Sequence, residues 1–208
     1  MERPIILNTE MVKAVLEGRK TQTRRVMDFP KSYMWNHEWF KKNYTFDKMF
    51  FDDIKNRNVA IFTDGEYTEW FKCPFGKVGN RLWVRETFQL SKGDMAPTLE
   101  EELTKTPHIR YYASDVPKYR DFDKWRPSIH MPREFSRITL EITDIRVERL
   151  QDISQEDREA EGYPEGKYGS YSFNWFVGLW NSIHKKENTW QDNPWVWVIN
   201  FKKLKHRR

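Results

Sequence analysis

The sequence predicts an α+β protein of one domain, in which a curled β-sheet is flanked by short helices. Apolar residues between 136 and 150 change parity at Thr143-Asp144, which predicts a bulge of the kind that curls a sheet. The segment 195–201 is apolar on both faces and is therefore expected inside the sheet. Two amphipathic stretches have helical spacing, and no linker of changed composition divides the 208 residues.

The first elements are a short apolar strand and a helix. Ile5-Ile6-Leu7 leads to Asn8-Thr9, which suits a helix N-cap, and apolar residues then recur at helical spacing. Gly18 stands where a left-handed residue commonly ends a helix. The sequence therefore predicts a helix between Asn8 and Gly18, with a sharp exit at Lys20.

A dense basic segment follows this helix. It reads Gly18-Arg19-Lys20-Thr21-Gln22-Thr23-Arg24-Arg25 and combines four cations with two hydroxyls. Such a cluster suits a phosphate-bearing or nucleobase ligand, and a solvated basic loop is the alternative. In an extended strand Lys20 and Thr23 point to opposite faces, so they act together only if the helix exit is bent.

Two stretches look like insertions into the main body. Residues 27–72 scatter aromatic side chains among polar ones, and only a strand at 58–62 before the Asp64-Gly65 turn is predicted within them. Residues 89–107 form the second stretch, with a short helical piece near 98–103. A strand at 108–113 returns the chain to regular structure.

Charged residues in the middle of the chain are further candidates. Arg85 and Glu86 lie in a predicted strand over 81–88, where a buried charge faces either a polar cavity or a cross-strand ion partner. His130 lies in a loop stiffened by Pro127 and Pro132. It binds phosphate, acts as an acid–base group, or is a structural hydrogen-bonding residue.

The last third of the chain predicts two helices. Ser154 and Asp157 form a capping-box variant that opens a short helix ending at Gly162. Glu161 falls in its last turn, where the helix dipole disfavours negative charge and gives the carboxyl a reason to keep its proton. A longer helix over 171–184 has an apolar stripe and Ser172 as its expected cap.

The amino-acid composition indicates which kinds of partner the protein binds. Lysine and arginine number 36 against 31 acidic residues, a net charge of +5 that mildly favours a polyanionic partner. The single cysteine, Cys73, excludes an internal disulfide and a cysteine-based zinc site, and we expect no metal and no cofactor. No apolar run approaches the about 18 residues of a membrane span, so we expect a cytoplasmic protein without a membrane partner. The oligomeric state stays open.

The basic segment resembles a known family signature. Gly18-x-Lys20-x-x-Thr23-x-Arg25 is similar to the Gly-x-Lys-x-x-Glu-x-Arg pattern of ASCH domains, a branch of the PUA-like barrels, with threonine in place of glutamate. The same variant is similar to the N4-acetylcytidine amidohydrolases. Stretches 79–86, 127–132 and 193–197 are similar to phage and prophage ASCH proteins, which would place the protein in a host cytoplasm.

This resemblance implies a PUA-like mixed β-barrel over residues 1–208, interrupted by the two insertions. It also implies a catalytic triad of Lys20, Thr23 and Glu161. Further residues are expected to contact the substrate: Arg24, Arg25, Arg85, Glu86 and His130. Trp83 and Tyr111 are candidates for stacking on its base.

Three functions follow from the resemblance. The first is hydrolysis of the N4-acyl amide of acetylated cytidine or a related modified nucleobase. The second is a non-catalytic module that binds RNA, in preference to DNA, or a modified nucleotide. A ribonuclease is the third, and the lack of clustered carboxylates in the sequence argues against it.

Overall fold

The computed structural model describes residues 1–28, 45–52, 57–91, 108–114, 124–164 and 170–205. The strands are β1 Glu2–Ile6, β2 Gln22–Val26, β3 Thr45–Asp52, β4 Arg57–Thr63, β5 Thr68–Lys72, β6 Arg81–Arg85, β7 Phe88–Ser91, β8 His108–Tyr111, β9 Thr139–Arg149 and β10 Trp195–Lys203. The helices are α1 Thr9–Leu16, α4 Gln155–Ala160 and α5 Ser170–Ile183, with short 3₁₀ turns η1 Ser128–His130, η2 Arg133–Phe135 and η3 Leu150–Asp152. The predicted α+β class is therefore confirmed.

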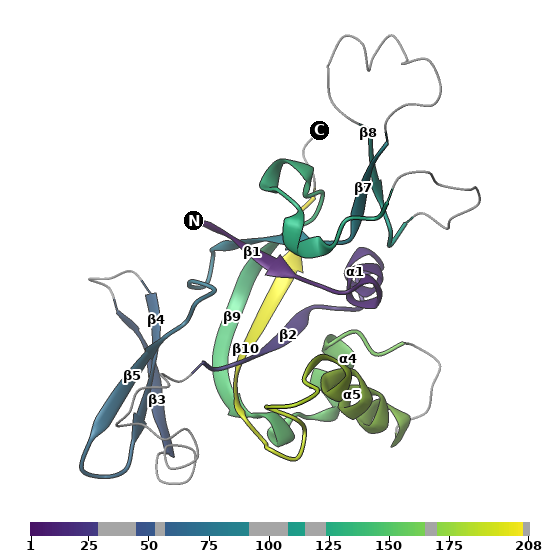
Figure 1. Ribbon diagram of the computed structural model, residues 1–208. Coiled ribbons are helices and arrows are strands. Elements are labelled where there is room, and N and C mark those ends of the chain that lie inside the picture. The colour runs from purple at the N-terminus through teal and green to yellow at the C-terminus, as the bar shows by residue number, and fades with distance from the viewer. Residues whose placement is uncertain (29–44, 53–56, 92–107, 115–123, 165–169, 206–208) are drawn as a thin grey trace.

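A five-stranded mixed sheet forms the centre of the molecule (Figure 1). Its order is β1-β6-β9-β10-β2, with β1 parallel to β6 and every other pair antiparallel. The edge strands are β1 and β2, and no backbone ladder joins them in the described part of the chain. The sheet is thus curled but open, and the closed barrel that the resemblance implied is not formed by these strands.

The predicted bulge lies in β9. Asn200 pairs with Asp144 and the next residue, Phe201, pairs with Ile142, so Thr143 is the extra residue. An unpaired residue in one strand increases the local bend and twist of the sheet. The parity break in the sequence therefore located the bend correctly.

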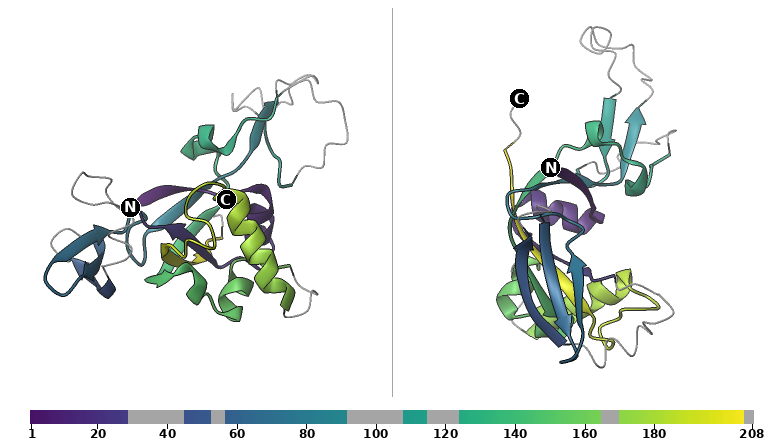
Figure 2. Two further views of the ribbon diagram at one scale, coloured as in Figure 1. Left: turned by 60° about the horizontal axis from the view of Figure 1, so that its bottom comes forward. Right: turned by 90° about the vertical axis from the view of Figure 1, so that its left-hand side faces the viewer.

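Strand β10 separates two hydrophobic cores. Trp197 and Ile199 pack into the larger core, together with residues of α1 and of the three-stranded sheet β3-β4-β5. Val196 and Val198 pack on the opposite face of β10, against α5. Figures 1 and 2 accordingly show the three-stranded sheet and the α4/α5 pair on opposite sides of the central sheet. The doubly apolar pattern of 195–201 thus correctly predicted an interior strand.

Several boundaries differ from the prediction. The strand predicted at 58–62 is confirmed as β4, but its neighbours β3 and β5 were not predicted. The strand predicted over 81–88 ends at Arg85. Helix α5 begins at Ser170, so Ser172 lies within the helix and is not its cap. The Ser172 side chain is buried, and its hydroxyl oxygen accepts a hydrogen bond of 3.2 Å from Arg158 Nε.

Two expectations are not resolved by the described residues. The helical piece predicted near 98–103 lies outside them. The division into a main body and two insertions stays a prediction. Among the helices that the structure describes, none has the length and apolar character needed to cross a bilayer.

Candidate active site

The end of α1 places Lys20 at the centre of the site. Asn8 Oδ1 accepts a hydrogen bond from the Met11 amide at 2.9 Å, which caps the start of α1 as predicted. Gly18 adopts a left-handed φ of 82°, and the Lys20 amide then donates to the Ala14 carbonyl at 3.0 Å. The chain therefore turns sharply between α1 and β2, which is the bend that the sequence required.

The end of α4 brings Glu161 to the same place. The capping box of Ser154 and Asp157 starts α4, and Glu161 is the residue that caps its C-terminus. Gly162 follows with a φ of 101°, and a Cβ at this position would lie 2.9 Å from the Ala14 Cβ. Only glycine allows α4 to end this close to α1.

A buried ion pair joins Lys20 and Glu161. Lys20 Nζ donates to Glu161 Oε2 at 2.5 Å and to the Glu161 carbonyl at 3.0 Å, and the two side chains are 0% and 3% exposed. Burial lowers the pKa of Lys20, the charges of Arg25 and Arg24 lower it further, and the Glu161 carboxylate opposes them. An isolated β-bridge between the two backbones holds the pair in register.

Arg24 extends the pair into a charged network. Its Nη2 lies 2.8 Å from Asp157 Oδ2 and 3.0 Å from Glu148 Oε2, and its Nη1 lies 3.5 Å from Glu161 Oε1. Arg146 also contacts both Asp157 and Glu148. Within the described residues, Glu161 Oε1 accepts no hydrogen bond. This oxygen therefore keeps acceptor capacity inside a buried, positively charged setting.

Arg25 lies on the opposite face of β2 from Arg24. Its Nη2 donates to the Ile6 carbonyl at 2.6 Å, whereas its Nε is buried and has no partner in the part of the chain described. Burial lowers the pKa of Arg25, and the Glu161 carboxylate partly offsets this effect. The guanidinium thus has a donor available for a ligand.

A small hollow connects these groups at the open edge of β2. Four of its lining residues are site residues predicted from the sequence: Thr23, Arg24, Arg25 and Glu161. Met11 of α1 and five residues of α5 and its end complete the lining: Phe176, Leu179, Trp180, Ile183 and His184. The hollow measures about 30 Å³, enough for a water molecule.

His184 is a site residue that the sequence analysis missed. Its ring stacks on that of Trp180 at a centroid distance of 4.4 Å and an interplanar angle of 26°. Burial and the charge of Arg25 lower its pKa, which favours the neutral imidazole. The sequence signal that could have identified His184 is its spacing, because it lies four residues after Trp180 and so shares the same face of the helix.

Three predicted substrate-binding residues have their contacts elsewhere. Glu86 forms a bidentate ion pair with Arg137, with both N–O distances 2.9 Å. Arg85 Nε donates to the Met131 carbonyl at 2.9 Å, and His130 is exposed in η1. The structure therefore brings together Lys20, Thr23, Arg24, Arg25 and Glu161, and does not bring Arg85, Glu86 or His130 to them.

The two aromatic candidates for stacking also contact protein groups. Trp83 lies 5.2 Å below the Arg85 guanidinium, and Tyr111 lies 4.0 Å below that of Arg137. The Tyr111 hydroxyl donates to the Phe135 carbonyl at 2.9 Å. Neither ring lines the hollow at β2.

The described residues contain few other groups that could take part in catalysis. They contain no group of three or more His, Cys, Asp or Glu side chains placed to hold a metal ion. Cys73 is buried, and burial raises the pKa of its thiol to about 11. At neutral pH this thiol is therefore protonated and a poor nucleophile.

Comparison of the chain with known proteins found few matches. No protein-family model matches the chain, and no curated protein matches it significantly. Among solved structures, the ASCH domain from Lactobacillus crispatus JV V101 is similar at 11% sequence identity and a TM-score of 0.41. The match covers 99% of this chain and 80% of that one.

Proposed function

We propose that this protein is an ASCH-type hydrolase that cleaves the N4-acyl amide of acetylated cytidine or of a related modified nucleobase. One observation carries the proposal: Glu161, which is paired with the buried Lys20, lines a hollow together with Thr23, Arg24 and Arg25. A base, an acid, a hydroxyl and two cations are the groups that amide hydrolysis needs.

The pair is suited to supply both proton-transfer groups. A lysine acts as a base only after losing its own proton, and burial beside two arginines favours that loss. Glu161 Oε2, at 2.5 Å, is the acceptor for this proton. Transfer along the hydrogen bond leaves a neutral amine and a neutral carboxylic acid, which are the base and the acid of the reaction.

The reaction then proceeds by attack of an oxygen on the acyl carbon, followed by departure of the amine. Lys20 takes the proton of the Thr23 hydroxyl, or of a water that Thr23 orients, and the oxygen attacks the acyl carbon. Arg24 and Arg25 stabilise the tetrahedral oxyanion. Glu161 gives its proton to N4 as the C–N bond breaks, which releases the cytosine amine. If Thr23 is the nucleophile, water hydrolyses the resulting ester and releases the carboxylic acid.

Substrate entry requires the site to open. A hollow of about 30 Å³ is far smaller than the about 300 Å³ at the lower end of ligand pockets. The side chains of α5 that line it, including Trp180, must move to admit a base. Such closure around a substrate also excludes water from the reacting groups.

A non-catalytic module for RNA or a modified nucleotide is the second candidate. It is favoured by the resting geometry, in which Lys20 is already bonded to Glu161 and Arg24 to Asp157 and Glu148. In that case these charges hold the edge of β2 in place and the ligand is bound without reaction. Phage origin and a cytoplasmic location remain predictions from the sequence.

Deacetylation of N4-acetylcytidine, followed by chromatography, tests the proposal. We expect the wild type to release cytidine and acetate, and Lys20→Ala and Glu161→Gln to lose the activity. Thr23→Val removes the hydroxyl with little change in shape, and Thr21→Val is its matched control because Thr21 is exposed on the same segment. Loss in Thr23→Val with retention in Thr21→Val supports the triad.

Two results would contradict the proposal, the first the hydrolase activity and the second the role of Thr23. The first is a wild type that turns over neither the nucleoside nor acetylated RNA. The second is equal activity in wild type and Thr23→Val, which would remove the hydroxyl from the mechanism. Tight binding of RNA without turnover would favour the second candidate.

A further inference from the structure

The Asp157 carboxylate on α4 accepts hydrogen bonds from three side chains of the central sheet. Its Oδ1 accepts from Gln22 Nε2 at 2.8 Å and from Arg146 Nη2 at 2.9 Å. Its Oδ2 accepts from Arg24 Nη2 at 2.8 Å and lies 3.5 Å from the Ser154 amide nitrogen. An ionised carboxylate has about four acceptor positions, and these contacts occupy them. Asp157 therefore binds groups of the protein itself and has no acceptor position left for a substrate.

Asp157 holds both terminal nitrogens of the Arg24 guanidinium. It binds Nη2 directly, and it binds the amide of Gln22, whose Oε1 accepts a hydrogen bond from Nη1. Glu148 also binds Nη2, at 3.0 Å, but within the described chain it bonds neither Nη1 nor Gln22. Loss of the Asp157 carboxylate would therefore release Arg24 in a way that loss of Glu148 would not.

A second carboxylate of the same helix lies beside Arg24. Glu161 follows Asp157 by four residues, so both side chains leave the same face of α4. Arg24 Nη1 is 3.5 Å from Glu161 Oε1, which is longer than the about 2.7–3.2 Å of an N–H···O hydrogen bond. The guanidinium is thus bonded to Asp157 and stops just short of a bond to Glu161.

This geometry affects the proton that Lys20 and Glu161 exchange. In the proposed hydrolase Glu161 takes a proton from Lys20, and a full ion pair with Arg24 would favour the charged carboxylate and oppose that step. We propose that Asp157 is a positioning residue, which holds Arg24 next to the hollow and keeps it from bonding to Glu161. The inference rests on the proposed function, and Asp157 acts on the reaction only through Arg24.

Turnover of N4-acetylcytidine by Asp157→Asn tests the inference. An amide of the same size has an acceptor oxygen on one side only, so Arg24 loses either its direct bond or the support of Gln22. We expect kcat to fall about a hundredfold, the order of effect of a 1 Å misplacement in an active site, and KM to change little. In an Arg24→Gln background the same substitution should cause no further loss. Losses of equal size in the two backgrounds would overturn the positioning role.

Ser154→Ala is the control for the stability of α4. The Ser154 hydroxyl accepts a hydrogen bond from the Asp157 amide at 3.1 Å and completes the capping box, whereas no hydrogen bond joins it to Arg24 in the described residues. Both Ser154→Ala and Asp157→Asn should lower the midpoint of urea unfolding, because both weaken the cap. Only Asp157→Asn should lower kcat. A loss of kcat as large in Ser154→Ala would assign the effect to the stability of α4 and overturn the inference.

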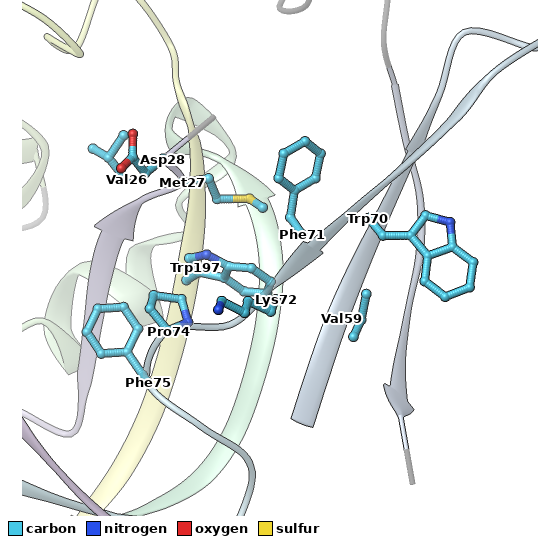
Figure 3. Close-up of a pocket in the computed structure, with 10 residues that line it drawn as sticks. All are labelled: Val26, Met27, Asp28, Val59, Trp70, Phe71, Lys72, Pro74, Phe75 and Trp197. Carbon is cyan, nitrogen blue, oxygen red and sulfur yellow. The ribbon is translucent and has the colours of Figure 1, made fainter. Parts of the chain in front are cut away.

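Asp28→Asn is the control for net charge, because it makes the same chemical change at another place. Asp28 is exposed just beyond β2 and lines a separate hollow, to which β5 and β10 also contribute side chains (Figure 3). None of the residues that line this hollow lines the candidate active site. We expect the kcat of the wild type in this variant. A loss as large as that of Asp157→Asn would assign the effect to net charge and overturn the inference.

The pKa of Lys20 provides a measurement that needs no turnover. Three charged groups act on Lys20, namely Glu161 at the end of α4 and the two arginines Arg24 and Arg25 of β2. The charge of Arg24 lowers the pKa of Lys20, and loss of the Asp157 carboxylate removes a negative charge that balances it. NMR titration of the Lys20 ammonium should therefore give a lower pKa in Asp157→Asn than in the wild type, Ser154→Ala or Asp28→Asn.

The two measurements distinguish failure of the inference from failure of the proposed function. If the wild type hydrolyses the nucleoside and Asp157→Asn keeps its kcat, the inference fails and the hydrolase stands. If nothing is hydrolysed but the pKa of Lys20 falls in Asp157→Asn alone, the hydrolase fails and the control of Arg24 by Asp157 stands.

Discussion

The guanidinium of Arg25 on β2 donates a hydrogen bond of 2.6 Å to the carbonyl oxygen of Ile6 on β1. These strands are the two edges of the central sheet, so a side chain links edges that the backbone leaves unpaired. The same arginine lines the hollow of the candidate active site. One contact therefore links the two edges of the curled sheet and also holds a cation of the candidate site in place.

Replacing Arg25 with leucine is expected to lower the free energy of unfolding by about 2 kcal/mol, the usual order for a hydrogen bond to a charged group. The Ile6 carbonyl loses its donor and β1 is held less firmly against β2. Urea unfolding measures the change, with Arg126→Leu as the control because Arg126 is exposed. Equal losses in the two variants would show that the link between the edges contributes nothing specific.

Lys20→Met and Glu161→Met are each expected to destabilise the protein by about 3–5 kcal/mol, because each leaves one buried charge without its partner. The double variant should lose much less than the sum of the two. A double-mutant cycle by urea unfolding gives this coupling directly. Additive losses would mean that the two side chains are not paired in solution.

Gly162→Ala is expected to cost more than the about 1–2 kcal/mol of a left-handed alanine, because its Cβ would also meet Ala14 and Lys20. Gly79→Ala is the matched control: Gly79 has a φ of 83°, but no atom lies within 4 Å of the added Cβ. The difference between the two variants isolates the close approach of α4 to α1. Equal costs would remove the packing argument for glycine at 162.

His184 is expected to titrate below its ordinary value of 6.5, because burial and the charge of Arg25 disfavour the imidazolium. With a lower pKa in the folded state, the unfolded chain binds more protons below pH 6.5. Stability therefore falls as the pH decreases from 6.5 to the folded-state pKa. NMR titration of the imidazole measures the pKa, and His184→Gln should remove this part of the pH dependence. A folded-state pKa at or above 6.5 would contradict the prediction.

Local signals in the sequence were sufficient for much of the fold. The cap at Asn8, the capping box at Ser154, the bulge at Thr143 and the interior strand 195–201 were all predicted correctly. Each depends on a few neighbouring residues whose chemistry favours one backbone geometry. By contrast, β3 and β5 were missed although they pair with β4 as sequence neighbours, because their mixture of aromatic and polar residues has no clear period.

The candidate site depends on contacts that sequence spacing does not encode. Lys20 and Glu161 are 141 residues apart, and only the family resemblance placed them together before the structure did. Arg85, Glu86 and His130 were predicted from their chemistry, but a buried carboxylate such as Glu86 is satisfied equally well by an ion pair away from the site, here with Arg137. His184 was missed because its stacking on Trp180 becomes meaningful only when α5 lies beside Arg25.

The place of β10 between β9 and β2 has a consequence for biosynthesis. Residues 22–26 leave the ribosome early, but the strand they pair with ends at Lys203. Both hydrophobic cores include side chains of β10, so neither is complete before that strand has been made. Proteins dominated by such distant contacts fold slowly, over milliseconds to seconds. The nascent chain therefore carries Lys20 without a finished site until almost all of these 208 residues have been translated.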